Sequence, residues 1–141
     1  MVYKMTKKIY DWLQENKPSL KVFIDEREKS SNVWLQFGIK NGGSYRIRFI
    51  SSDDDNDVSV RAYAIVSVDS AKRSKVLEAV NSLNNEYRYV KFVIDEDNDI
   101  NVEYDFPVRA DNVEECAMEM ISRFVDIIDE AYPTIMRVIF N

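Results

Sequence analysis

The residue types that carry most enzyme chemistry are scarce in this sequence, and histidine is absent altogether. Histidine is the commonest general base near neutral pH and the usual nitrogen ligand for zinc, copper and iron. Its absence removes every nucleophilic triad or dyad that depends on an imidazole. What remains for chemistry is one cysteine, Cys116, and a surplus of carboxylates.

Cys116 and the carboxylate pairs are weak candidates for catalysis. Cys116 falls at a helical spacing that fits the core, and no histidine is available to lower its pKa, so we expect it to be buried. Glu114 and Glu115 are adjacent on an expected helix and diverge, while Glu103 and Asp105 fall on the wet face of an expected strand. We therefore predict no catalytic residues. An enzyme that works through carboxylates alone is kept as a further hypothesis, behind the two binding functions given at the end of this subsection.

Two acidic loops, residues 53–57 and 95–99, carry alternating aspartates like those of an EF-hand calcium loop. Neither has the glycine that the sixth position needs or the bidentate glutamate of the twelfth position. We therefore expect solvated turns, because Asp and Asn readily hydrogen-bond their own backbone. Weak cation binding is the alternative, and we predict no metal site and no cofactor.

The turn Asn41-Gly42-Gly43 joins two expected strands. A phosphate-binding loop joins a strand to a helix, so we do not expect this turn to bind phosphate.

The clearest secondary-structure signal in the sequence is the pattern of residues 90–106, and it shows how these residues are positioned. Apolar residues alternate with polar ones on both sides of a polar break, at Val90, Phe92, Ile94, Ile100, Val102, Tyr104 and Phe106. A period of two on both sides predicts an antiparallel hairpin with one apolar face and one wet face. Helical patterns before and after it supply the natural cover for the apolar face.

The same periodicities place the other elements. We expect an opening helix that Pro18 stops, strands near residues 20–25, 32–39, 45–49 and 58–68, a helix over 71–87, and a last helix from Asp111 or Asn112. Pro133 should kink or break that last helix, because proline lacks the amide hydrogen. The fold class is therefore α+β: an antiparallel sheet of about six strands with three helices, in the order helix, four strands, helix, two strands, helix.

Aromatic, apolar and cationic residues fall together on the outer face of the expected sheet, in the register opposite the core. Large exposed patches of this kind, rich in aromatic residues and arginine, favour protein interfaces. We predict a partner-binding surface of Phe23, Trp34, Arg46, Arg48, Arg61, Tyr63 and Ile65. Two alternatives stay open: the first helix or the tail could cover this face, and the arginines could pair with carboxylates across strands.

The length and composition of the sequence limit the kinds of protein that it can be. The 141 residues suit one domain over residues 1–141, and the net charge of −6 disfavours general attraction to nucleic acid or anionic lipid. No stretch approaches the roughly 20 apolar residues of a membrane span. A single cysteine forms no internal disulfide and suggests no oxidising compartment, so we expect a cytoplasmic protein without nucleic-acid or membrane partners.

Three segments carry a resemblance to a known family: residues 80–84 (Val-Asn-Ser-Leu-Asn) closing a helix, residues 92–100 with their acidic turn, and Asp105-Phe106-Pro107 before a helix that ends near a proline. Together they resemble the YbjN family of small bacterial proteins, described as sensory transduction regulators. The element order agrees over most of the chain. One departure is Asn98, which stands where the family has a turn glycine and tolerates the same backbone conformation.

The resemblance implies a fold like that of type III secretion chaperones, which are homodimers that hold segments of other proteins. It supplies no catalytic residues. We therefore expect a non-enzymatic protein- or peptide-binding module, chaperone-like or regulatory, and a homodimer. A sensory regulator with a small-ligand pocket between sheet and helices is the alternative.

Overall fold

The period-two and helical patterns become six antiparallel strands and three α-helices in the computed structural model, which describes residues 2–52, 57–107 and 112–141. The elements follow in the order α1 (Lys4–Asn16), β1 (Phe23–Glu26), β2 (Ser30–Gly38), β3 (Ser44–Ser52), β4 (Asp57–Ser67), the 3-10 turn η1 (Ser70–Lys72), α2 (Arg73–Glu86), β5 (Lys91–Ile94), β6 (Asp99–Pro107) and α3 (Val113–Ile139). The predicted α+β class and element order are confirmed. The predicted start of the last helix at Asp111 lies outside the described residues.

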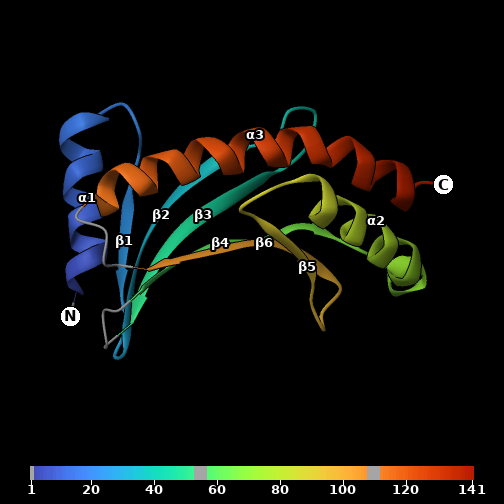
Figure 1. Ribbon diagram of the computed structural model, residues 1–141, viewed down its shortest axis with the longest axis horizontal. Coiled ribbons are helices and arrows are strands. Elements are labelled where there is room, and N and C mark those ends of the chain that lie inside the picture. Colours follow the sequence, from blue (N-terminus) through green and yellow to red (C-terminus); the bar gives the residue numbers. More distant parts are fainter. Residues whose placement is uncertain (1, 53–56, 108–111) are drawn as a thin grey trace.

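The strands form one sheet in the order β1-β2-β3-β4-β6-β5, and every neighbouring pair is antiparallel. After α2 the chain returns as the hairpin β5–β6, with β6 placed beside β4. The sheet is curved, and α3 crosses above it while α1 and α2 lie toward opposite ends (Figure 1). All three helices cover the same face of the sheet.

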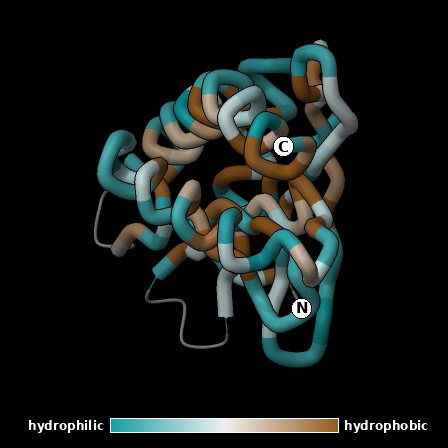
Figure 2. Tube along the Cα trace, turned by 90° about the vertical axis from the view of Figure 1, so that its right-hand side faces the viewer, coloured by the Kyte–Doolittle hydropathy of each residue, from teal (hydrophilic) through white to brown (hydrophobic). Residues whose placement is uncertain are grey.

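The core lies between that face and the helices. Val33, Ile47 and Phe49 of the sheet and Leu13 and Phe124 of the helices are all completely or almost completely buried. Seen along the long axis of the molecule, hydrophobic residues gather on the inner sides of the elements and hydrophilic ones at the periphery (Figure 2). Within the described ranges, no helix combines the length and the apolar character that crossing a bilayer demands.

The last helix is continuous, so the break that the sequence offered as one outcome at Pro133 does not occur. Helix α3 runs through the proline to Ile139. Pro133 lies on the exposed side of the helix, while Ala131 and Ile135 on either side of it are buried in the core. The hydrogen bond that proline removes is therefore lost on the side facing water, and packing on the inner side keeps the helix in one piece.

Two predicted turns have the backbone that their residues suggested. Asn41 and Asn98 both have a positive φ, of 61° and 64°, which asparagine tolerates better than most residues. Gly42 has a second role, because a Cβ atom there would lie 2.8 Å from the Tyr132 ring of α3. The β2–β3 turn thus packs directly against the last helix.

Helix α2 buries one stripe of residues, formed by Val76, Ala79, Val80 and Leu83. Leu77 lies outside this stripe and is 46% exposed. Arg73, which opposes the dipole at the start of α2, donates hydrogen bonds to the Asp95 carbonyl and the Asn98 side chain. It therefore ties α2 to the turn between β5 and β6.

Candidate functional site

The outer face of the sheet is left uncovered, since all three helices pack on the other side. The predicted alternative, that the first helix or the tail covers this face, is wrong: α1 docks on the inner face, where the buried Thr6 hydroxyl lies 2.6 Å from Ser31 Oγ of β2. Phe23 and Tyr63 are 45% and 48% exposed on the outer side. Large side chains here are open to a partner.

One cross-strand row spans the whole sheet on this outer face. Residues directly opposite one another across the six strands are, in order, Phe23, Trp34, Arg48, Arg61, Glu103 and Lys91. Side chains in such a row are in contact range of their neighbours. The row changes from aromatic at the β1 edge, through two arginines, to an acid and a lysine at the β5 edge.

Trp34 is the centre of the aromatic end. Its ring stacks on Phe23 of β1 with a centroid distance of 4.3 Å, and the Arg46 guanidinium of β3 lies 4.0 Å from the ring centroid. Trp34 Nε1 donates a hydrogen bond of 3.0 Å to Asp25 Oδ2, which fixes the ring orientation. Stacked rings and cation–π contacts each contribute roughly 0.5–1 kcal/mol at partly exposed sites.

Arg46 and Arg48 have different surroundings. Arg48 donates a 2.9 Å hydrogen bond to Asn32 Oδ1 and lies 3.6 Å from Asp25 Oδ2, so its charge is engaged. Arg46 is exposed and forms no ion pair within the described ranges; its contact is the Trp34 ring. Of the two, Arg46 is the cation available to an incoming acidic group.

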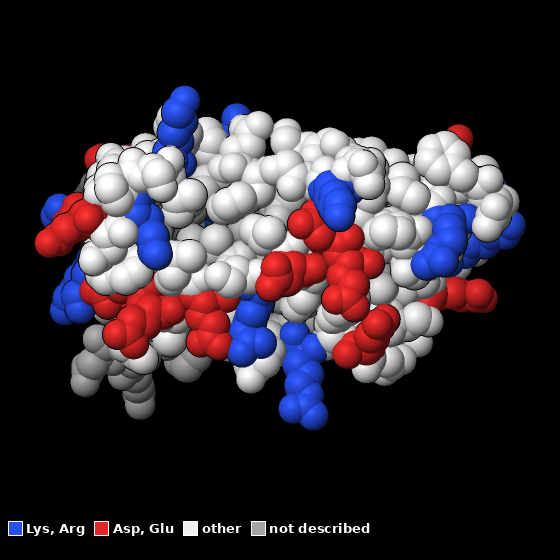
Figure 3. Space-filling model, turned by 90° about the horizontal axis from the view of Figure 1, so that it is seen from above, with Lys and Arg blue, Asp and Glu red and all other residues white. Residues whose placement is uncertain are grey.

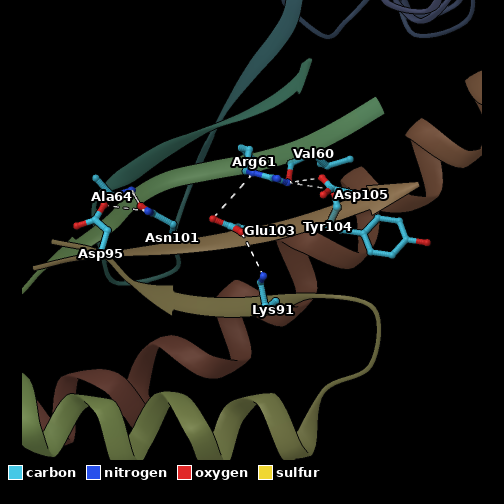
Figure 4. A network of polar contacts seen from close by, with 9 residues as sticks. All are labelled: Val60, Arg61, Ala64, Lys91, Asp95, Asn101, Glu103, Tyr104 and Asp105. Carbon is cyan, nitrogen blue, oxygen red and sulfur yellow. Dashed lines mark hydrogen bonds and ion pairs between the residues drawn. The ribbon is translucent and has the colours of Figure 1, made fainter. Parts of the chain in front are cut away.

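The Arg61 side chain is hydrogen-bonded and ion-paired to residues of strands β4 and β6. Its Nη1 donates 2.7 Å and 2.9 Å hydrogen bonds to Asp105 Oδ1 and the Val60 carbonyl, and its Nε lies 3.9 Å from Glu103 (Figure 4). Burial alone would lower the pKa of Arg61, but the hydrogen bond and charge of Asp105 raise it overall. The same hydrogen bond lowers the pKa of Asp105. At this arginine, cross-strand pairing is the arrangement found.

Ile65 does not lie on the outer face, and its predicted position there is wrong. It is 7% exposed and belongs to the core. The register of β4 against β6 shifts between Ala62 and Val66, and Ala64 has a φ of 51°. A bulge of this kind reverses which residues face inward, because side chains alternate strictly along a strand.

The bulge is held by a chain of polar contacts with the β5–β6 hairpin. The Ala64 amide donates to Asn101 Oδ1 at 2.8 Å, and Asn101 Nδ2 donates to Asp95 Oδ2 at 3.0 Å (Figure 4). Asn101 is buried, with an exposed fraction of 6%. A buried polar side chain with both ends bonded specifies the local geometry of β4.

The same contacts explain the acidic turn at residues 95–99. Asp95 Oδ1 accepts hydrogen bonds from the amides of Asp97 and Asp99, and these bonds, that of Asp99 foremost, lower the pKa of Asp95. The carboxylate therefore satisfies its own turn, as predicted. Within the described residues no cluster of His, Cys, Asp or Glu could hold a metal ion. Asp53 and Asp55 of the other acidic loop lie outside them.

Cys116 and the carboxylates of β6 are the remaining candidates for chemistry. Cys116 is half-buried instead of fully buried, and burial, with the charges of Glu119 and Glu115, raises the pKa of its thiol. A thiol with a raised pKa is a poor nucleophile. Glu103 and Asp105, which the sequence offered only as weak candidates, both face Arg61.

Two hollows bear on the choice between a partner and a small ligand. A hollow between β6 and α3, beside Cys116 and Tyr104, measures about 160 Å³, which is below the roughly 300–1,000 Å³ of typical ligand pockets. A hollow of about 400 Å³ on the outer face is lined by Gln36, Ser44, Tyr45, Arg46, Arg48 and Tyr63. The outer-face hollow shares Arg46, Arg48 and Tyr63 with the predicted surface.

The structure thus brings together only part of the predicted partner-binding surface. Phe23, Trp34, Arg46, Arg48 and Tyr63 share the outer face, Arg61 shares it but is paired, and Ile65 leaves it. Sequence reasoning missed Asp25 and Gln36. Their alternation with Ile24 and Leu35 was the available signal, since it places them on the same face as Trp34.

Comparison with known proteins identifies a family and a fold. The model of the YbjN family, described as "Putative bacterial sensory transduction regulator", matches residues 36–137. The crystal structure of YbjN from E. coli, described as a putative transcription regulator, is 18% identical, with a TM-score of 0.61 over 94% of each chain. At this identity the likeness shows a shared fold. No curated protein matches the chain.

Proposed function

Because this chain belongs to the YbjN family, we propose that it is a bacterial regulator that works by binding a protein or peptide and not by catalysis. We further propose a single domain over residues 1–141, a cytoplasmic location and a homodimer. The chaperone-like element of the proposal is that a segment of another protein is held on the outer sheet face.

The uncovered outer face carries this proposal. Phe23 and Tyr63 expose nearly half of their surface there, and Arg46 offers a cation without an ion-pair partner in the described residues. Exposed aromatic surface next to arginine is the composition that protein interfaces favour. Nearby, Asp25 and Asn32 fix Trp34 and Arg48, so part of the surface is already ordered before a partner arrives.

A pair of matched double variants tests this role. Tyr63→Asp with Arg46→Glu alters the outer face, and Leu77→Asp with Lys75→Glu makes the same charge changes on α2, where Leu77 is 46% exposed. In affinity capture from the native host, we expect the wild type and the α2 variant to retain the same protein and the outer-face variant to lose it. Equal retention by both variants would contradict the proposed surface.

The non-enzymatic part has its own test. Purified protein should turn over no metabolite in a manner that depends on a carboxylate. Turnover that disappears when Glu103, Asp105 or another single acid is neutralised would overturn this part of the proposal.

A further inference from the structure

The two edges of the sheet are finished differently. At the β5 edge, Asn84 of α2 donates from Nδ2 to the Phe92 carbonyl at 2.9 Å and accepts from the Phe92 amide at 2.7 Å. Both backbone groups of Phe92 are thereby satisfied by a side chain. This is one way in which proteins block an edge against pairing with another chain.

The other edge is open over part of its length. Strand β1 pairs with β2 between Ser31 and Trp34, but β2 continues to Gly38, paired on its other side with β3. Residues 35–38 therefore have no strand partner on the β1 side within the described ranges. Unpaired edge backbone is a template for strand addition by an extended peptide.

Space for such a peptide lies beside this open edge. A hollow of about 610 Å³ runs between residues 35–38 of β2 and the segment that precedes β1, and Ser19, Leu20, Lys21 and Phe23 form its other wall. Leu20 and Phe37 pack partly against the core. The hollow thus offers apolar walls as well as an unpaired strand.

The charges around this edge define the occupant. The hollow shares Gln36 and Ser44 with the outer-face hollow, and together their linings contain Lys21, Arg46 and Arg48 but no acidic residue. Arg48 is already paired with Asp25 of β1, which leaves Lys21 and Arg46 to face a partner. In a chain with a net charge of −6 this is a local exception, and the helix-covered side displays a band of acidic side chains (Figure 3). Complementary charge favours an acidic partner here.

A second copy of the chain fits the same edge less well. Two copies that paired through residues 35–38 about a two-fold axis would bring Lys21 and Arg46 of both copies to one interface. Like charges brought close together are destabilising. An acidic segment of another protein meets no such repulsion.

We propose that an extended, acidic segment of a partner protein adds as a strand to residues 35–38 of β2, with its carboxylates facing Lys21 and Arg46. This inference rests on the proposed binding role and adds the chemistry and conformation of the partner. Backbone hydrogen bonds provide the pairing, and the apolar walls and cations select the sequence.

Synthetic peptides test the conformation of the partner. The probe is a capped octapeptide of alternating valine and glutamate, and its controls are the same peptide with lysine for glutamate and one with N-methylated amides along one edge. We expect the acidic peptide to bind at least about tenfold more tightly than either control. It should also slow amide exchange at Gln36 and Gly38, because backbone groups alternate along a strand and the Ile39 amide already bonds the Gly43 carbonyl on the β3 side. Equal binding by the N-methylated peptide would overturn strand addition while leaving the outer-face proposal intact.

Protein variants test the charges. Lys21→Glu with Arg46→Glu should weaken binding of the acidic peptide at least about tenfold. Lys75→Glu with Arg88→Glu changes the net charge equally, on exposed residues away from this edge, and should leave binding within about twofold. Equal weakening by both variants, or no binding of the acidic peptide to the wild type, would overturn the inference.

Dissociation of a wild-type dimer by the peptide would also overturn it, because that result would assign the edge to a second copy of the chain. The capture experiment tests the proposed function independently of these results.

Discussion

Buried polar residues in this protein are satisfied in one place and left without a partner in another. Asn101 bonds at both ends of its side chain, to the Ala64 amide and to Asp95. The Tyr45 hydroxyl is buried and forms no hydrogen bond with any described residue. Burial, together with the charges of Asp129 and Asp126 on α3, raises the pKa of Tyr45 well above its usual range. A buried hydroxyl without a partner costs free energy relative to its exposure in the unfolded chain.

Tyr45→Phe should therefore increase the free energy of unfolding, by about 1 kcal/mol. Urea unfolding at neutral pH measures this. The folded protein holds Tyr45 protonated at pH values where the unfolded chain ionises it, so the wild type loses stability as the pH rises above the ordinary tyrosine pKa of about 10. The free energy of unfolding of the Tyr45→Phe variant should fall less over the same alkaline range. A loss of stability at neutral pH would show that the hydroxyl has a partner after all.

The elements are joined by polar contacts as well as by the core, and α1 is the clearest case. Its first turn contains no acidic residue, and Tyr3, at the N-cap position before the helix, makes no side-chain cap hydrogen bond. Two serines on the inner face of the sheet replace the cap: the Tyr3 amide donates to Ser31 Oγ at 2.9 Å, and the Thr6 amide donates to Ser51 Oγ at 3.1 Å. Free amides at a helix start need such acceptors. The contact therefore fixes α1 on β2 and β3.

Ser31→Ala should lower the free energy of unfolding by about 1–2 kcal/mol, because it leaves the buried Tyr3 amide without its acceptor and removes a hydrogen-bond partner of the buried Thr6 hydroxyl. Chemical denaturation measures the change, and faster amide exchange in α1 locates it. Ser82→Ala, at an exposed position of α2, is the matched control and should have little effect. An unchanged α1 in the Ser31→Ala protein would contradict this account of the docking.

At the scale of the whole molecule, the two faces of the sheet have different roles. The inner face and the helices make the core, while the outer face has exposed aromatic residues and arginines. Helix α3 also carries more apolar surface than the core uses: Met136 and Ile139 are only partly buried, and Phe140, just after the helix, is 81% exposed. An exposed phenylalanine beside partly buried apolar residues suits a contact between two copies. We place the proposed homodimer contact at this end of α3.

Light scattering at micromolar concentration should accordingly give twice the mass of one chain. Phe140→Asp places a charge in the proposed contact and should shift the protein toward a monomer. Leu77→Asp adds the same charge at the exposed Leu77 of α2 and should stay dimeric. A clean monomer mass for the wild type would contradict the homodimer.

Local pattern was enough to predict the elements and most of the outer face. Alternation placed Trp34, Arg46, Arg48, Arg61 and Tyr63 opposite the buried residues of their strands, because the period of two is a property of the strand itself. The turn asparagines Asn41 and Asn98 were predictable for the same local reason. The family resemblance likewise depended on short segments of sequence.

Only the tertiary structure decided what distant residues impose on these patterns. Ile65 turned inward because the Ala64 amide bonds Asn101, which lies 37 positions away in the sequence. Pro133 left α3 unbroken because packing of its buried neighbours against the rest of the core outweighs one lost hydrogen bond. Which arginine stays available was settled by the order of the strands, which places Asp105 and Glu103 of β6 beside Arg61 but leaves Arg46 beside Trp34. Periodicity fixes the face on which a residue lies, and the pairing of distant strands fixes its neighbours.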